Sequence, residues 1–292
     1  MSGLEEWLRD WSPEAQRSTG QITGWSVGAF AGCLDQPDPT GHAAVAPPLW
    51  HLFGFLPRPA QAELGADGHP ADGPFLPPIP HRRRMFAGGR LRVERELPVD
   101  RAIERTSAVT SVRVKSGRTG ELAFVTVRIE YAVDGGPPSV VEEQDLVYRS
   151  QPDSAPGPAQ ARPAGSADAG AEPEQAADHE LTIVPDPTLL FRFSALTYNA
   201  HRIHYDEAYA TGVEGHQGLV VQGPLLALLA LELPRRHRPD ARVVEFDYRL
   251  RKPAYAGAPV RALARVGEAW EFEVGVPGGP PSLTATARLR AT

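Results

Sequence analysis

The stretch from 150 to 178 constrains the fold of this chain more than any other feature of its sequence. These 29 residues contain no Val, Ile, Leu, Met, Phe, Tyr or Trp, and consist mainly of Ala, Pro, Gly, Ser, Gln and charged residues. Such a segment has no large apolar side chains to bury, so it cannot offset the entropy cost of ordering its backbone. We therefore expect a flexible linker at 150–178 that separates an N-terminal half, 1–149, from a C-terminal half, 179–292.

Composition narrows the class of protein. With 292 residues, 41% of them hydrophobic, the chain can bury the core of one large or two ordinary domains. A net charge of −6 argues against a general nucleic-acid binder. The single cysteine, Cys33, excludes an internal disulfide and fits a reducing compartment. The longest apolar run, Leu225–Leu231, is far shorter than the roughly 20 residues that span a bilayer. We expect a cytoplasmic protein with neither nucleic acid nor membrane as a partner.

The N-terminal half has the pattern of an antiparallel meander. A helix is predicted at Leu4–Trp11, and turn signals at 116–118 and 134–136 separate runs rich in β-branched residues. The predicted strands are Arg90–Leu97, Ile103–Lys115, Leu122–Val133 and Val140–Tyr148.

The C-terminal half combines a buried helix with further strands. Leu225–Leu233 is apolar nearly all the way round, which is typical of a helix buried on most sides. Gly223 and Pro224 should begin this helix, and Pro234 should end it. The predicted strands are Leu181–Val184, Val243–Leu250, Val260–Gly267, Trp270–Val276 and Leu283–Leu289. Periodicity alone therefore predicts an α+β fold with an antiparallel sheet, and the apolar helix suggests a sheet wrapped around it, as in a hotdog fold.

The two halves also resemble each other. The segment Phe30–Asp35 is similar to Phe193–Tyr198, and both halves end in strands. The N-terminal copy has no histidine in the matching loop, and its Pro-rich stretch at 36–80 is not typical of a buried helix. We interpret the N-terminal half as one that shapes a pocket without catalysing.

The densest group of polar side chains lies at Ser194–Asp206 and contains His201 and His204. A His-x-x-His pair can supply two metal ligands, but no further ligand pattern accompanies it, so we expect no metal. A structural role in a surface turn is a second interpretation. The glycine motif that follows favours catalysis, because a histidine that titrates near neutral pH can both accept and donate a proton.

That glycine motif, Gly218–Leu225, ends directly before the predicted buried helix. The first N–H groups of a helix have no partner within the helix, and the helix dipole places partial positive charge there. Gly223 is therefore a candidate donor to a carbonyl oxygen on which negative charge develops. An ordinary tight helix start explains the same residues, and the motif alone does not decide between the two.

Long segments of both halves carry a family resemblance. The C-terminal half reads FSALTYNAHRIHYDEAYA…GLVVQGPLLALL, and the N-terminal half contains PPLWHLFGF, LGADGHPADGPFLPPIPHRRRMFAGGRL and EEQDLVYR. These segments resemble the MaoC-like, (R)-specific enoyl-thioester hydratase/dehydratase superfamily. The most similar branch holds mitochondrial-type 3-hydroxyacyl-thioester dehydratases and mesaconyl- and itaconyl-CoA hydratases. The resemblance implies a double hotdog, two antiparallel sheets each wrapped around a helix, with the N-terminal helix degenerate.

The resemblance also suggests roles for residues. His204 stands at the position of the superfamily's catalytic histidine, and Asn199 stands where the wider superfamily has a catalytic aspartate. Because an amide cannot act as a general base, His204 is predicted to be the main proton carrier, with Asn199 orienting the water or hydroxyl. Gly223 would polarise the thioester carbonyl. The substrate-binding residues implied by these segments are Arg202, Gln222 and Pro224; histidine is common at the position of Gln222.

Two further clusters in the N-terminal half are candidates for the substrate site. The basic run at 81–84 offers Arg83 and Arg84 to coenzyme A phosphates or to a substrate carboxylate, because arginine pairs well with planar anions. A solvated surface run is an equally good interpretation. Asp67–Pro70 is a turn by composition, and lining the pocket is the alternative.

These observations predict a hydro-lyase that acts on an α,β-unsaturated acyl thioester and needs no cofactor. The resemblance favours a short branched dicarboxyl-CoA of the mesaconyl type as substrate. A 3-hydroxyacyl dehydratase that takes a carrier-protein thioester is the first alternative, and a hotdog thioesterase is less favoured because the loop offers a histidine. A non-catalytic acyl-thioester-binding protein is the alternative outside enzymes. A homodimer is among the expected assemblies.

Overall fold

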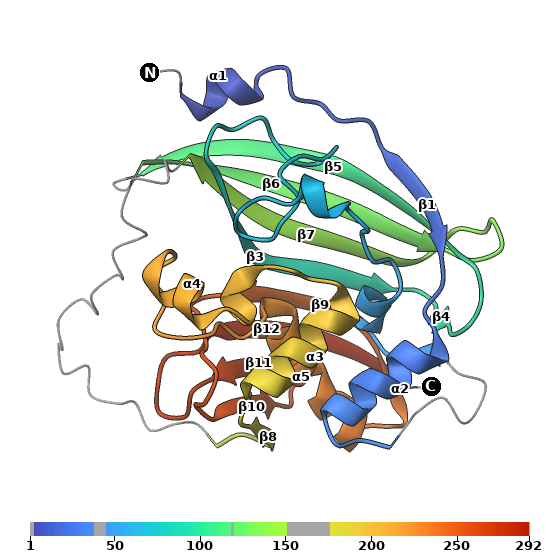
Figure 1. Ribbon diagram of the computed structural model, residues 1–292. Helices are drawn as coiled ribbons and strands as arrows, with labels where there is room; N and C mark the ends of the chain where they lie inside the picture. Colours follow the sequence, from blue (N-terminus) through green and yellow to red (C-terminus); the bar gives the residue numbers. More distant parts are fainter. Residues whose placement is uncertain (1–2, 38–44, 118–119, 151–175, 292) are drawn as a thin grey trace.

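A single ten-stranded sheet runs through both halves of the protein (Figure 1). The computed structural model describes residues 3–37, 45–117, 120–150 and 176–291. In spatial order, the strands are β1 (Gln16–Gly20), β5 (Ile103–Gly117), β6 (Gly120–Ala132), β7 (Pro138–Ser150) and β3 (Arg82–Val93), followed by β9 (Ala241–Leu250), β12 (Leu283–Ala291), β11 (Trp270–Gly275), β10 (Val260–Arg265) and β8 (His179–Ile183). The fold is α+β with an antiparallel sheet, as expected. Residues 151–175 of the predicted linker lie outside the described residues.

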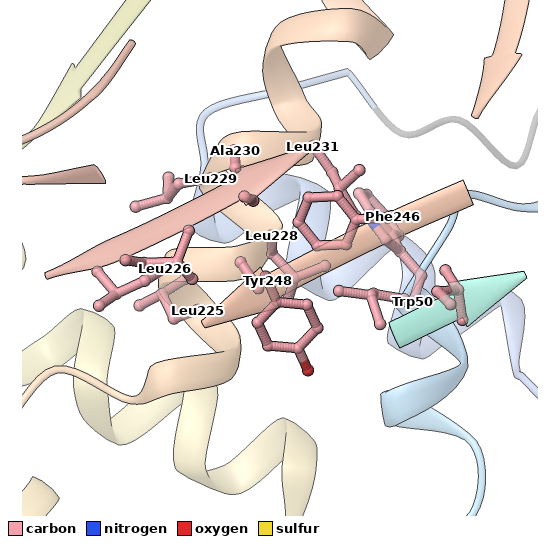
Figure 2. Packing of buried hydrophobic residues seen from close by; sticks show 14 of the residues in the cluster. Trp50, Leu225, Leu226, Leu228, Leu229, Ala230, Leu231, Phe246 and Tyr248 are labelled. Carbon is pink, nitrogen blue, oxygen red and sulfur yellow. The ribbon is translucent and has the colours of Figure 1, made fainter. Parts of the chain in front are cut away.

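The long apolar helix lies on one face of the C-terminal strands. Helix α5 (Gly223–His237) contacts all five strands from β8 to β12. Figure 2 shows its leucines, among them Leu225 and Leu228, beside Phe246 and Tyr248 of β9. Every residue from 225 to 234 is buried. The strands therefore wrap around α5. In the described part of the chain, no helix is long and apolar enough to cross a membrane.

The expected end of α5 at Pro234 is wrong, because the helix continues to His237 with Pro234 inside it. The last turn is held by the buried carboxylate of Glu232. It accepts hydrogen bonds from Arg235 at 2.6 Å and Arg236 at 3.2 Å. Such i,i+3 and i,i+4 pairs stabilise a helix, and here they bridge the turn in which proline removes a backbone donor.

Strand β3 joins the two halves, since it pairs with β7 on one side and β9 on the other. It begins at Arg82, earlier than expected, and continues through Gly88 and Gly89. Gly88 has φ +145° at a bulge, and a Cβ there would collide with the carbonyl oxygen of Tyr248 on β9. The two glycines allow the halves to approach, because a Cβ at Gly88 or Gly89 would collide with backbone atoms of a neighbouring strand.

The N-terminal half has no counterpart of α5 within the described residues 45–81. Only the short 3-10 helices η2 (Trp50–Phe53) and η3 (Gln61–Glu63) are found there, as the predicted degenerate helix implies. Helix α2 (Gly24–Cys33) packs on α3 (Pro187–Thr197), with the Phe30 and Phe193 rings 5.9 Å apart. The two similar segments thus meet. The remaining elements are α1 (Leu4–Leu8), β2 (Val45–Ala46), β4 (Leu97–Pro98), η4 (Arg202–His204) and α4 (Glu207–Gly212).

Candidate active site

The polar cluster of the C-terminal half forms a compact loop between α3 and α4. Helix α3 ends at Thr197, and Tyr198 takes a left-handed conformation with φ +49°. This turn lets the N–H of Asn199 donate to the Ser194 carbonyl at 2.8 Å. Asp206 then caps α4 by accepting from the Tyr209 N–H at 3.0 Å. The caps at both ends fix the single 3-10 turn, η4, that carries His204.

His204 is held in one tautomer. Its side chain is buried, and its Nδ1 lies 2.7 Å from the carbonyl oxygen of Val220. A carbonyl can only accept, so Nδ1 carries the proton and Nε2 of the neutral ring is an acceptor. Burial lowers the pKa of His204 to about 4, although the bond to Val220 acts in the opposite direction. The imidazole is therefore neutral near pH 7, which is the form a general base needs.

The chain runs from Val220 directly into the N-terminus of α5. A Cβ at Gly223 would collide with the end of the Leu250 side chain, so a larger residue there would require Leu250 to shift. Its N–H makes no hydrogen bond within the described part of the chain. Gln222 donates to the Leu190 carbonyl at 2.9 Å and to Ser194 Oγ at 3.0 Å, and its Oε1 is buried without a partner. The start of α5 thus offers a free donor close in sequence to the residue that anchors His204.

Asn199 and His201 lie on the same loop. Asn199 Oδ1 accepts from the His201 N–H at 3.0 Å, which leaves the amide nitrogen as the group that can still donate. The His201 ring lies edge-on to that of His204, with centroids 5.5 Å apart. Burial, together with neighbouring His69 and His204, lowers the pKa of His201 to about 2, so this ring also stays neutral.

A turn from the N-terminal half completes the cluster. The His69 ring lies 4.1 Å from the His201 ring, and Asp67 Oδ2 lies 3.1 Å from His69 Nδ1. The sequence of Asp67–Pro70 is compatible with a plain turn and with a pocket lining. The structure brings it against the loop of His201, although no local pattern linked the two segments.

Asp67, His69 and His201 could also be considered as metal ligands, since one possible ligand atom of each lies within 4.8 Å of the others. Both oxygens of Asp67 already accept hydrogen bonds from His69, one from the ring and one from the backbone. Hydrogen bonding thus accounts for the arrangement, and we assign no metal to it.

The three arginines at the start of β3 have different surroundings. Arg82 donates to the carbonyl oxygens of Pro77 and Ala71, so it ties down the preceding loop. Arg83 forms an ion pair with Glu214. Arg84 is exposed, is close enough for its charge to lower the pKa of His201, and makes no hydrogen bond or ion pair within the described residues. Of the two predicted anion-binding arginines, Arg84 is the one with a guanidinium still available.

Arg202 has a local role in the structure. Its guanidinium donates to Asp206 at 2.7 Å and lies over the Tyr209 ring, 4.1 Å from the centroid. Pro224 occupies the first turn of α5, where its missing N–H costs nothing. These contacts explain the positions of Arg202 and Pro224 without a substrate.

Two buried tyrosines were not anticipated from the sequence. The hydroxyl group of Tyr148 on β7 is buried and has no hydrogen-bond partner within the described residues, and burial raises the pKa of both Tyr148 and Tyr248, which lies on β9. Buried polar groups are usually satisfied, so Tyr148 is a candidate to bind a polar atom of a ligand. A separate groove of about 310 Å³ is lined mainly by outward-facing residues of β3, β9 and β12, among them Arg249 and Thr284. Because side chains alternate along β9, Arg249 points away from the α5 face.

Comparison with solved structures identifies the fold. A MaoC-like dehydratase from Phytophthora capsici matches with a TM-score of 0.67 and 14% identity, over 99% of this chain and 98% of that one. A Mycobacterium tuberculosis protein described as a double hotdog matches with a TM-score of 0.56 and 15% identity, over 96% of both chains. The protein is therefore a double hotdog of the MaoC-like type.

Sequence comparison identifies the family. The model of hydroxyacyl-thioester dehydratase type 2 matches residues 49–256. A mesaconyl-C(4)-CoA hydratase from Chloroflexus aurantiacus is 45% identical over 268 residues, which cover 89% of this chain and 90% of the relative. The chain belongs to the hydroxyacyl-thioester dehydratase type 2 family, and it is a hydro-lyase of acyl thioesters. The predicted class of enzyme is confirmed.

Proposed function

We propose that this protein adds water reversibly to the double bond of an α,β-unsaturated acyl-CoA, with His204 as the general base. The observation that carries the proposal is the state of His204. The Val220 carbonyl fixes its Nδ1–H at 2.7 Å, and burial keeps the ring neutral, so Nε2 is free to accept a proton.

The remaining groups of the C-terminal half fit the same reaction. As Nε2 of His204 takes a proton from water, the water oxygen bonds to the β-carbon of the substrate. The electron pair of the C=C bond moves toward the thioester, and negative charge develops on its oxygen. The N–H of Gly223 donates to that oxygen, and the dipole of α5 stabilises the charge. The α-carbon then takes up a proton, and Asn199 orients the attacking water through its amide nitrogen.

The acyl group that we propose is a short branched dicarboxyl chain of the mesaconyl type. Its support is the 45% identical relative, which acts on mesaconyl-C(4)-CoA, together with the available guanidinium of Arg84 close to His201. A guanidinium binds a carboxylate through two parallel hydrogen bonds, which would hold the free carboxylate of such a substrate. We propose a cytoplasmic enzyme, as the single cysteine suggests, and a homodimer as its assembly.

A substrate panel tests this function. Mesaconyl-CoA, itaconyl-CoA, crotonyl-CoA and a crotonyl carrier protein are compared by the loss of the absorbance of the conjugated thioester. We expect the highest kcat/KM with a dicarboxyl-CoA. Better turnover of the carrier-protein thioester would favour a 3-hydroxyacyl dehydratase instead. Binding of every thioester without conversion would identify a non-catalytic binding protein.

A further inference from the structure

We propose that His69, oriented by Asp67, is the second proton-transfer residue of the active site, supplied by the N-terminal half. The inference rests on the proposed function. Hydration needs one group that removes a proton from water and another source of the proton that reaches the α-carbon. His204 is the first of these, and Asn199 cannot be the second because an amide does not exchange a proton at neutral pH. The other imidazole of the loop, His201, is kept neutral by burial, so a proton donor has to come from another segment.

The turn that carries His69 is fixed firmly to that loop. Gly68 has φ +89°, and a Cβ there would collide with the carbonyl oxygen of Ala200. The N–H of Arg202 donates to the Asp67 carbonyl at 2.9 Å, and its guanidinium donates to the Ala66 carbonyl at 3.0 Å. These contacts join segments 136 positions apart in the sequence. His69 is thus held beside the catalytic loop by main-chain bonds and by a glycine that only this close approach requires.

Asp67 orients the imidazole of His69. Its Oδ1 accepts the backbone N–H of His69 at 3.0 Å, and its Oδ2 lies 3.1 Å from Nδ1. Because a carboxylate accepts, Nδ1 carries a proton, and Nε2 is the nitrogen that faces away from Asp67. Burial alone would raise the pKa of Asp67, but the bonds from His69 and its charge lower it to about 2. The anionic carboxylate accepts from Nδ1–H, so Nε2 is the atom through which His69 can exchange a proton with a substrate.

The surroundings of His69 distinguish it from the other two histidines. Its side chain is 24% exposed, whereas His204 is buried at 7%. The titratable and charged groups that face the cluster are Asp67, His201, His204, Arg84 and, next to His204, His216. Asp67 is the one carboxylate among them. Because His69 is the more exposed of the two and is bonded to that carboxylate, it is better placed than His204 to exchange a proton with solvent.

The reaction balances with this pair. Nε2 of His204 takes a proton from water while the water oxygen bonds to the β-carbon. Nε2–H of His69 then donates its proton to the α-carbon, and the electron pair returns from the thioester oxygen to restore the carbonyl. His204 is left protonated and His69 neutral. Exchange of both with solvent restores the starting state, with no net gain or loss of protons.

The test is the kinetics of His69→Ala with the substrate that the wild-type enzyme turns over best. We expect kcat to fall about 10²-fold or more, with KM changed less than about threefold. Added imidazole should restore part of kcat, because it can occupy the space of the lost ring and supply a proton. His237→Ala is the matched control: its imidazole lies at the far end of α5, stacked on His179, and its loss should leave kcat unchanged.

Asp67→Asn gives an independent readout that does not remove the ring. It should lower kcat by a smaller factor than His69→Ala and leave KM unchanged, because the ring stays in place but loses the carboxylate that orients it. A normal kcat in His69→Ala would overturn the inference. So would a loss confined to KM for dicarboxyl substrates, which would make His69 a carboxylate-binding residue, or a loss of wild-type activity in EDTA that zinc restores. Failure of the proposed function is distinct, since the wild-type enzyme would then hydrate no enoyl thioester.

Discussion

Each half of the protein holds a buried histidine, but the two are held in different ways. His51, on η2 of the N-terminal half, has Nε2 2.9 Å from Oε2 of Glu142, and both side chains are at most 3% exposed. Tyr131 at 3.5 Å and Gln144 at 2.9 Å also donate to Glu142. His204, in the C-terminal half, bonds a neutral carbonyl through Nδ1 only. Each ring is bonded through one nitrogen. The bond of His51 is to a buried carboxylate, which ties the ring into the fold, whereas that of His204 is to a neutral carbonyl, which leaves an uncharged ring that can serve as a base.

The helices of the two halves also differ, in their length and in what their N-termini can offer to a site. In the C-terminal half, α5 is 15 residues long and places its N-terminus next to the loop of His204. In the N-terminal half, η2 is four residues long, too short to present a comparable helix end. The buried His51–Glu142 pair fills part of the interior there. We interpret the N-terminal half as one that has no catalytic centre of its own and holds a polar pair in its interior, and we propose that its Asp67–His69 turn acts on the other half.

The largest effect is expected from removing the imidazole of the C-terminal half. His204→Ala should lower kcat by about 10²- to 10⁴-fold, because a general base is removed. The free energy of unfolding should fall less than in a variant that breaks a buried charged pair, since only a bond to a neutral carbonyl is lost. Steady-state kinetics and urea unfolding of the same preparation measure both. If His201→Ala abolished kcat while His204→Ala left it normal, the roles within the loop would have to be exchanged.

The matching change in the N-terminal half should affect stability and leave catalysis intact. His51→Ala leaves Glu142 buried without its partner, and breaking such a pair costs roughly 3–5 kcal/mol. We expect that loss in the free energy of unfolding measured with urea, with kcat of the folded fraction unchanged. A variant of normal stability and low kcat would place His51 in the reaction.

The pair also predicts how stability depends on pH. Burial alone would raise the pKa of Glu142, but the hydrogen bond and charge of His51 lower it below its ordinary 4.5. The stabilisation is therefore present above pH 4.5 and is lost as pH falls through the lowered folded-state pKa. Glu142→Gln should reduce this acid-dependent loss in urea titrations between neutral and acidic pH. An unchanged pH dependence in this variant would contradict the linkage.

A smaller effect, on KM, should distinguish the neighbouring residues Arg84 and Arg83 of the N-terminal half. Arg84→Ala should raise KM for a dicarboxyl-CoA about tenfold, the effect of losing about 1.4 kcal/mol of binding, and leave KM for crotonyl-CoA unchanged. Arg83→Ala is the control: it loses the ion pair with Glu214, so its effect should appear in stability. Equal changes in KM for both substrates would indicate that Arg84 binds the coenzyme A and not the substrate carboxylate.

Much of the fold follows from local pattern. Alternation of apolar residues predicted β5, β6 and β9 to β12 to within a few residues of their observed ends. Strand β1 was missed because Gln16–Gly20 is polar, and it is defined by backbone pairing with β5. The early start of β3 was missed because glycines usually interrupt strands, whereas Gly88 is needed for close packing. The division of the chain at 150–178 stays a prediction.

The candidate site was predicted in part. His204, Asn199 and Gly223 lie near one another in sequence, and the motif around them placed them correctly on a loop and a helix start. The Asp67–His69 turn could not be assigned to the same site, because its contact with the catalytic loop is tertiary. The signal that could have found it is Gly68, a glycine between two polar residues, but such a pattern is equally typical of an ordinary turn.

We infer that two similar halves make one active site per chain, and the stoichiometry of ligand binding is the decisive measurement. A non-reactive acyl-CoA analogue is titrated into the wild-type enzyme in a calorimeter, with His204→Ala as a variant that should still bind. We predict one site per chain in both proteins. Two equivalent sites per chain would contradict the account, because the N-terminal half would then bind substrate by itself.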